Sequence, residues 1–170
     1  CPDHWNLTHP DVVQQVPAAY AAAGSQIVLT NTFRANRVAL ASYDLADSAA
    51  EINRRGVEIS RRAADQKAYV FASMGPSGKM LCSGEIEATV LRDAFDEQAQ
   101  ALAAAGADAI VVETMAELEE AEQAVQAALA TGLPVVACVV FDSGAEMDRT
   151  MMGVPPETAA QFLTQTGAHV

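Results

Sequence analysis

The sequence is short of basic residues. Ten lysines and arginines stand against 22 aspartates and glutamates, which gives a formal net charge of -12. Such a surface repels phosphate backbones and anionic lipid, so neither nucleic acid nor a membrane is an expected partner. No apolar run approaches the roughly 20 residues that a spanning helix needs, and no signal peptide is predicted because a basic region followed by an apolar one is missing at the N-terminus.

Cysteine and histidine are also scarce. Cys1, Cys82 and Cys138 are odd in number, widely spaced and without a C-x-x-C pair, which argues against a disulfide framework or a closed zinc knuckle and favours a reducing, cytoplasmic location. The three histidines form no helical i, i+4 pair, so no metal ligand set is expected within residues 1–170. A first residue that is Cys rather than Met indicates a piece of a longer protein.

What the sequence does contain is an alternation of helical and strand patterns. Short apolar runs predict strands, and 3.6-residue periodicity between Pro and Gly signals predicts helices. Strands are expected at 26–30, 68–73, 109–112 and 133–141, with the start of another at 167–170. Helices are expected at 10–24, 35–43, 47–65, 87–105, 115–131 and 156–166.

One phrase recurs at the helix-to-strand junctions. Residues 21–30 and 103–112 both read as a helix end, a glycine, a polar residue and a buried strand, and a shortened copy starts at Gly167. Such a repeat predicts right-handed βαβ units and a parallel sheet in a single 170-residue α/β domain. A (β/α)₈ barrel needs about 250 residues, so the chain would supply part of one. An open doubly wound sheet is the alternative.

The stretch 106–115 is the most informative junction. Its apolar run ends in Glu113, which is therefore expected at the carboxyl end of a parallel strand, where active sites of α/β proteins lie. Thr114 and Glu117 match a capping box for the following helix, and the Glu117, Glu119, Glu120, Glu122 cluster is expected to be a solvated helix face. The structural alternative for Glu113 is that it only supplies negative charge to the helix N-terminus.

The other strand ends bring small polar residues to the same edge. They are Asn31, Thr32, Ser73 and Gly75, which together with Glu113 suit a polar small molecule better than a nucleophilic triad. Each has a structural alternative as well, since Asn31 could form a turn and Ser73 could bond to backbone.

Five phrases in order resemble the homocysteine S-methyltransferase family, which includes betaine-homocysteine methyltransferases and the homocysteine domain of cobalamin-dependent methionine synthase. The phrases span almost the whole chain and are Asn6-Leu-Thr-His-Pro-Asp11, Leu29-Thr-Asn-Thr-Phe33, Ser73-Met-Gly-Pro-Ser-Gly78, Val111-Val-Glu-Thr-Met115 and Arg149-Thr-Met-Met-Gly153. The resemblance implies strands two to five of a (β/α)₈ TIM barrel plus the start of strand six. It also implies an enzyme that transfers a methyl group from a donor, left open here, to the homocysteine sulfur, giving methionine.

The resemblance further implies zinc, held by three cysteines, that binds the substrate sulfur as a thiolate. Cys1, Cys82 and Cys138 do not match those cysteine motifs, so the zinc ligands are expected outside this chain. The family's first strand is likewise expected outside it. The 170 residues alone are predicted to bind no zinc and to turn over no substrate. By the same resemblance Glu113 receives the substrate ammonium group, and Asn31, Thr32, Ser73 and Gly75 line the same mouth. No catalytic residue is assigned.

Two alternatives of another kind stay open. A half-barrel with unpaired strand edges could be a structural or interaction module that pairs with itself or another chain. The chain could also belong to another α/β enzyme that binds a small amino or carboxylic acid. Whether it forms a homo-oligomer is not decided by the sequence.

Overall fold

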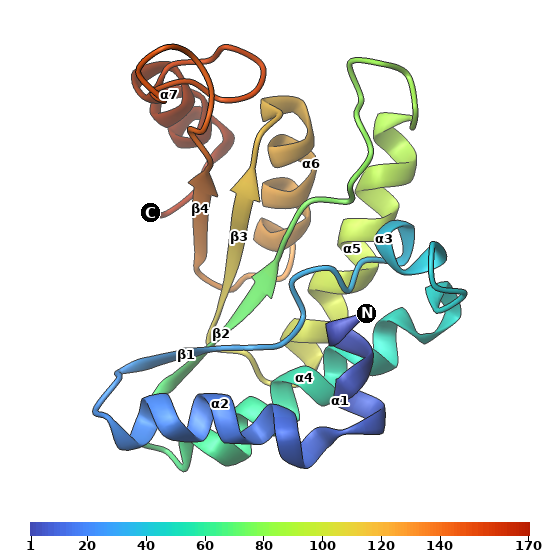
Figure 1. Ribbon diagram of the computed structural model, residues 1–170, viewed down its shortest axis with the longest axis vertical. Helices are drawn as coiled ribbons and strands as arrows, with labels where there is room; N and C mark the ends of the chain where they lie inside the picture. Colours follow the sequence, from blue (N-terminus) through green and yellow to red (C-terminus); the bar gives the residue numbers. More distant parts are fainter.

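The computed structural model describes all residues 1–170 and contains one parallel sheet (Figure 1). Its four strands are β1 (Ile27–Leu29), β2 (Tyr69–Met74), β3 (Ala109–Met115) and β4 (Val135–Val139), and they lie side by side in sequence order. All three neighbouring pairs are parallel, with Leu29 opposite Phe71 and Ser73 opposite Val111. The predicted α/β class and parallel βα units are therefore confirmed.

Helices alternate with these strands. They are α1 (Trp5–Thr8), α2 (Pro10–Ala22), α3 (Arg37–Ala41), α4 (Ala49–Ala64), α5 (Ala88–Ala104), α6 (Leu118–Leu129) and α7 (Pro156–Thr166), with 3₁₀ turns at Pro2–His4 and Ala46–Ser48. Every helix expected from 10–24 onward is present, with ends moved by up to three residues. No helix is both long enough and apolar enough to cross a membrane.

The two faces of the sheet differ in burial. One face packs against the helices and contributes to the larger of two cores, a cluster of 21 buried residues to which each strand adds at least one side chain: Val28, Val70, Ile110 and Val135. The residues that alternate with these face the other way, and Ile27, Leu29 and Tyr69 are 41%, 48% and 64% exposed. Because helices cover only one face, the arrangement is that of part of an α/β barrel, in which strands enclose an inner space.

The last residues continue the sheet beyond β4. The His169 N–H donates to the Val135 carbonyl at 3.0 Å, and the Ala137 N–H donates to the Val170 carbonyl at 2.9 Å. The C-terminus accordingly lies beside β4 (Figure 1). These hydrogen bonds agree with the prediction that a further strand begins after Gly167.

The junction between β3 and α6 differs from the prediction. The strand runs on through Met115, and α6 begins only at Leu118, without a side-chain cap. The capping-box prediction is therefore wrong: Thr114 lies within the strand with φ of +63°, and Glu117 precedes the helix with its carboxylate engaged elsewhere. The reason is a register shift between Val112 and Met115, a β-bulge that lengthens the strand.

The bulge changes which side chains face the core. Strict alternation from Ile110 and Val112 would turn Met115 to the inner face. Met115 instead belongs to the same core as Ile110 and Val112 and is 1% exposed. Glu113 and Thr114 occupy the irregular segment, which frees the Glu113 side chain from the regular pleat.

Candidate functional site

Two of the predicted site residues meet at the carboxyl edge of the sheet. Ser73, near the end of β2, donates a hydrogen bond from its hydroxyl to Glu113 Oε1 at 2.6 Å. Ser73 is only 2% exposed, whereas Glu113 is partly exposed. Ser73 bonds to Oε1, and no hydrogen bond within the chain reaches the other carboxylate oxygen, Oε2. The pair thus presents an oriented, negatively charged acceptor at the end of the two central strands.

The backbone of Ser73 is fixed by the end of β1. The Ser73 N–H donates to Thr30 Oγ1 at 3.0 Å, the Thr30 and Thr32 hydroxyl oxygens are 2.5 Å apart, and the Thr32 hydroxyl donates to the Ser73 carbonyl at 2.8 Å. Thr32 is completely buried, so it supports Ser73 from behind and lines no open surface. Thr30 belongs to the same cluster and was missed by the sequence reasoning, because it reads as an ordinary strand residue.

Gly75 contributes through its lack of a side chain. Its N–H donates to the Phe33 carbonyl at 2.7 Å, so the two loops approach closely. An added Cβ would lie 2.5 Å from Phe33 Cδ2 and 2.7 Å from the Phe33 carbonyl oxygen, well inside van der Waals contact. Gly75 therefore joins the loops that follow β1 and β2 at the mouth.

Asn31 is occupied by the N-terminal segment. Its amide donates to the Pro2 carbonyl at 2.9 Å and to Asn6 Oδ1 at 3.0 Å. The buried Asn6 side chain in turn donates to the carbonyls of Asn31 and Ile52. The Asn31 side chain therefore holds the N-terminal segment in place and forms no hydrogen bond with Ser73 or Glu113.

A long loop, residues 75–87, leads from β2 to α5 and is anchored by α6. Glu117 and Glu120 are 3% and 4% exposed, so the predicted solvated face is wrong for these two residues. Their carboxylates accept hydrogen bonds from Ser77, Leu81 and Cys82 in this loop. Glu119, between them, is exposed as expected.

A thiol lies close enough to Glu113 to respond to its charge. Cys138, on β4, is exposed as a whole residue, but its thiol is partly desolvated. This desolvation, together with the charge of the Glu113 carboxylate, raises the pKa of the thiol. The thiol is therefore protonated at neutral pH. The sequence gives no sign of this proximity, which depends on Cys138 lying on the strand next to β3.

The cysteines do not assemble into a metal site. Cys1, Cys82 and Cys138 are all free, and no group of three His, Cys, Asp or Glu residues is placed to hold a metal ion. The residues present do not fit the zinc that the family resemblance implies.

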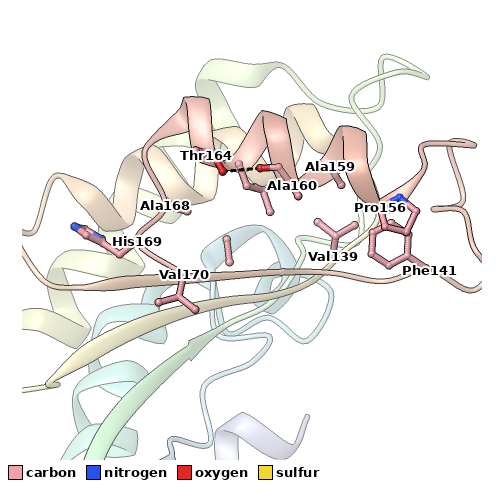
Figure 2. A pocket seen from close by; sticks show the side chains of 11 residues that line it. Val139, Phe141, Pro156, Ala159, Ala160, Thr164, Ala168, His169 and Val170 are labelled. Atoms are coloured by element: carbon pink, nitrogen blue, oxygen red, sulfur yellow. Dashed lines mark hydrogen bonds between the residues drawn. The ribbon is translucent and has the colours of Figure 1, made fainter.

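A separate cavity lies between β4 and α7. It has a volume of about 400 Å³ and is lined mainly by apolar side chains such as Val139, Phe141 and Leu163 (Figure 2). Each of its two polar side chains makes one hydrogen bond within the chain, since Thr164 donates to the Ala160 carbonyl and His169 Nδ1 accepts from the Val135 N–H. It offers a polar ligand nothing comparable to the Ser73–Glu113 pair.

The fold and the site define a class: a parallel βα array, part of an α/β barrel, with a carboxylate at its carboxyl edge. The chain belongs to the homocysteine S-methyltransferase family, because the family model described as "Homocysteine S-methyltransferase" matches residues 1–169. The family resemblance is thereby confirmed.

Curated relatives are much longer than this chain. "Methionine synthase" of Mycobacterium leprae (strain TN) is 40% identical over 131 residues, which cover 74% of this chain and 11% of that protein. "Methionine synthase" of Mycobacterium tuberculosis (strain ATCC 25618 / H37Rv) matches with the same identity and coverage. The aligned part of the chain therefore corresponds to about a tenth of the length of these relatives.

Solved structures support the fold. The homocysteine methyltransferase MmuM from Escherichia coli, in its metallated form, superposes with a TM-score of 0.80 at 20% identity, covering 96% of this chain and 62% of that one. The apo form gives a TM-score of 0.74, with 98% and 62% coverage. The chain thus has the fold of roughly three fifths of that protein.

Proposed function

We propose that the protein carrying this chain transfers a methyl group to the sulfur of homocysteine, giving methionine. Membership of the family supports the reaction class. The observation that carries the proposal to this chain is the Ser73–Glu113 hydrogen bond of 2.6 Å at the carboxyl edge of the sheet. This hydrogen bond supports the proposal, because barrels bind their substrates at this edge of the sheet.

In this proposal Glu113 receives the ammonium group of homocysteine. The Ser73 hydroxyl holds Oε1, which leaves Oε2 to accept a charge-assisted hydrogen bond from the substrate. Thr32 and Gly75 act indirectly, since one holds the Ser73 carbonyl and the other lets the two loops approach. Asn31 acts at the rim of the site, where its amide holds the N-terminal segment through the Pro2 carbonyl.

The zinc of the proposed reaction would have to be held by residues outside 1–170, because this part of the barrel offers no ligand set. The role of this chain is therefore to bind and orient the amino acid end of the substrate. Its three free cysteines favour a reducing compartment such as the cytoplasm.

The proposal can be tested by replacing Glu113 in the complete protein that contains this sequence. Glu113→Gln keeps the shape but removes the charge, and should raise the Kd and KM for L-homocysteine about tenfold to a hundredfold, the usual worth of a hydrogen bond to a charged group. Glu119→Gln, at the neighbouring exposed carboxylate, is the matched control and should change neither. Unchanged affinity in Glu113→Gln, or no methionine formed by the unaltered protein with any methyl donor, would refute the proposal.

A second candidate rests on the exposed apolar side chains. Ile27, Leu29 and Tyr69 face away from the helices, and β1 pairs on one side only. An open edge beside an apolar face favours association with a second copy or another chain. Size-exclusion chromatography of the 170-residue chain distinguishes the two ideas, because a folded monomer at micromolar concentration would exclude the pairing module.

A further inference from the structure

Residues 75–85 of the long loop after β2 are held by two carboxylates at the start of α6, Glu117 just before the helix and Glu120 in its first turn. Glu120 Oε1 accepts from both the Ser77 N–H at 2.7 Å and the Ser77 hydroxyl at 2.6 Å. Glu117 accepts from the Leu81 N–H through Oε2 at 2.9 Å and from the Cys82 N–H through Oε1 at 2.7 Å. Figure 1 shows this segment rising from β2 to the top of α5, with α6 between it and β4.

These carboxylates are buried without a cation. Neither forms a salt bridge, although buried charges are usually paired with one. Burial, with the charge of Glu117 nearby, raises the pKa of Glu120 against the lowering effect of the Ser77 hydrogen bonds. An apolar helix face would avoid this desolvation cost but would leave the N–H groups of Ser77, Leu81 and Cys82 without acceptors. Each of these directional hydrogen bonds holds the loop backbone at one position.

The anchored loop and the Ser73–Glu113 pair share their chain connections. The loop begins two residues after Ser73, and Glu117 comes four residues after Glu113. Gly75 is fixed from the other side by its hydrogen bond to the Phe33 carbonyl. A displacement of the loop would therefore be passed to Ser73, whose hydroxyl sets the direction of the Glu113 carboxylate.

We propose that Glu117 and Glu120 are positioning residues for the substrate site. By holding loop 75–85 against α6 they keep Ser73 and Glu113 aligned for an amino acid ammonium group. The inference rests on the proposed function for its ligand, while the anchoring itself can be measured without any ligand.

The atoms used by each carboxylate predict that the same substitution has different effects at the two positions. Glu117 uses both oxygens, so Glu117→Gln must turn an NH₂ group toward one loop N–H and lose that hydrogen bond. Glu120 uses only Oε1, so Glu120→Gln can keep both bonds through its amide oxygen. Glu120→Ala loses both, and Glu119→Gln serves as an exposed control on the same turn.

Backbone amide exchange measures the anchoring in the longest protein that carries the chain. In Glu117→Gln, exchange should be about tenfold faster at whichever of the Leu81 and Cys82 amides loses its acceptor, and exchange at Ser77 should be faster by a similar factor in Glu120→Ala. Glu120→Gln and Glu119→Gln should match the unaltered protein. The Cys82 thiol reports independently: its pKa is raised by desolvation and by the hydrogen bond and charge of Glu117, so Glu117→Gln should speed its alkylation by iodoacetamide.

Calorimetric titration with L-homocysteine then tests the positioning role. Affinity should fall about tenfold in Glu117→Gln and Glu120→Ala, and Glu120→Gln should restore it. If Glu113→Gln loses affinity while Glu117→Gln and Glu120→Ala keep it, the proposed function holds and the positioning role is overturned. Unchanged exchange in these two variants also overturns it. If the unaltered protein binds no homocysteine, the proposed function fails and the positioning role fails with it.

Discussion

The contact between Gly75 and Phe33 leads to a quantitative prediction for Gly75→Ala. The φ angle of Gly75 is not positive, so alanine can adopt its backbone conformation, and the expected effect comes from crowding alone. The new Cβ would lie 2.5 Å from Phe33 Cδ2, and closer still to Cε2, where carbon atoms normally stay about 3.5–4.0 Å apart. The ring would have to move by about 1 Å.

Moving the ring does not relieve the whole conflict. The Cβ would also lie 2.7 Å from the Phe33 carbonyl oxygen, which accepts the Gly75 N–H bond. Adding one carbon to a packed contact usually costs about 1–3 kcal/mol of unfolding free energy, and the backbone conflict places this site in the upper part of that range. For a chain of this size the melting temperature should fall by roughly 4–12 °C.

Urea denaturation followed by circular dichroism gives the free energy, and a double-mutant cycle separates ring from backbone. Phe33→Ala should relieve the ring contact, so the cycle should show a coupling of about 0.5–2 kcal/mol, with the backbone part remaining. If Gly75→Ala unfolds within about 0.5 kcal/mol of the unaltered chain, the close approach of the two loops is not tight and the reasoning fails.

Two further predictions concern parts of the fold away from the mouth. Burial acts to raise the pKa of Asp108, but hydrogen bonds from Arg61 and the Val70 N–H lower this pKa overall. The ionised Asp108 therefore stabilises the fold fully above the ordinary carboxyl pKa of 3.8, and this stabilisation is lost as the pH falls through the lowered pKa. Asp108→Asn should cost about 1 kcal/mol of unfolding free energy at pH 7 and nothing in acid, and a constant difference from pH 7 to pH 2 would contradict this. The fully buried Asn53 donates to the Ala35 and Ala49 carbonyls and accepts from Gln98, so Asn53→Ala should cost about 2–4 kcal/mol in urea denaturation, and a loss below 1 kcal/mol would show that the network relaxes.

The order of elements could be predicted from the sequence because each strand is a short apolar run between glycine and polar signals. The recurrence of one junction at 21–30 and 103–112 indicated parallel strands, and a parallel sheet requires their carboxyl ends to share an edge. That rule alone placed Ser73 beside Glu113. The same rule placed Asn31 at this edge but could not show that its amide turns toward Pro2 and Asn6.

The anchoring of loop 75–85 could not be predicted in the same way. A run of glutamates at the start of a helix is usually solvated, and the donors to Glu117 and Glu120 lie 35 to 43 residues earlier in the chain. The spacing of three residues between Glu117 and Glu120, on one helical face beside the buried Ala121, is the only local sign. The bulge at Thr114 is hidden for a related reason, because Val111-Val-Glu-Thr-Met115 is equally compatible with a regular strand end.

The irregular geometry at Thr114 has a consequence for how this segment can change in length. Removing the exposed Thr114 would leave two residues from Val112 to Met115, which matches the two from Ala137 to Val139. A regular pleat would then keep Met115 on the core face, and only the bulge would disappear. The core therefore does not require the extra residue, whereas Glu113 would return to the regular pleat without it. Family members that use the carboxylate at this position should keep the extra residue, whatever its type.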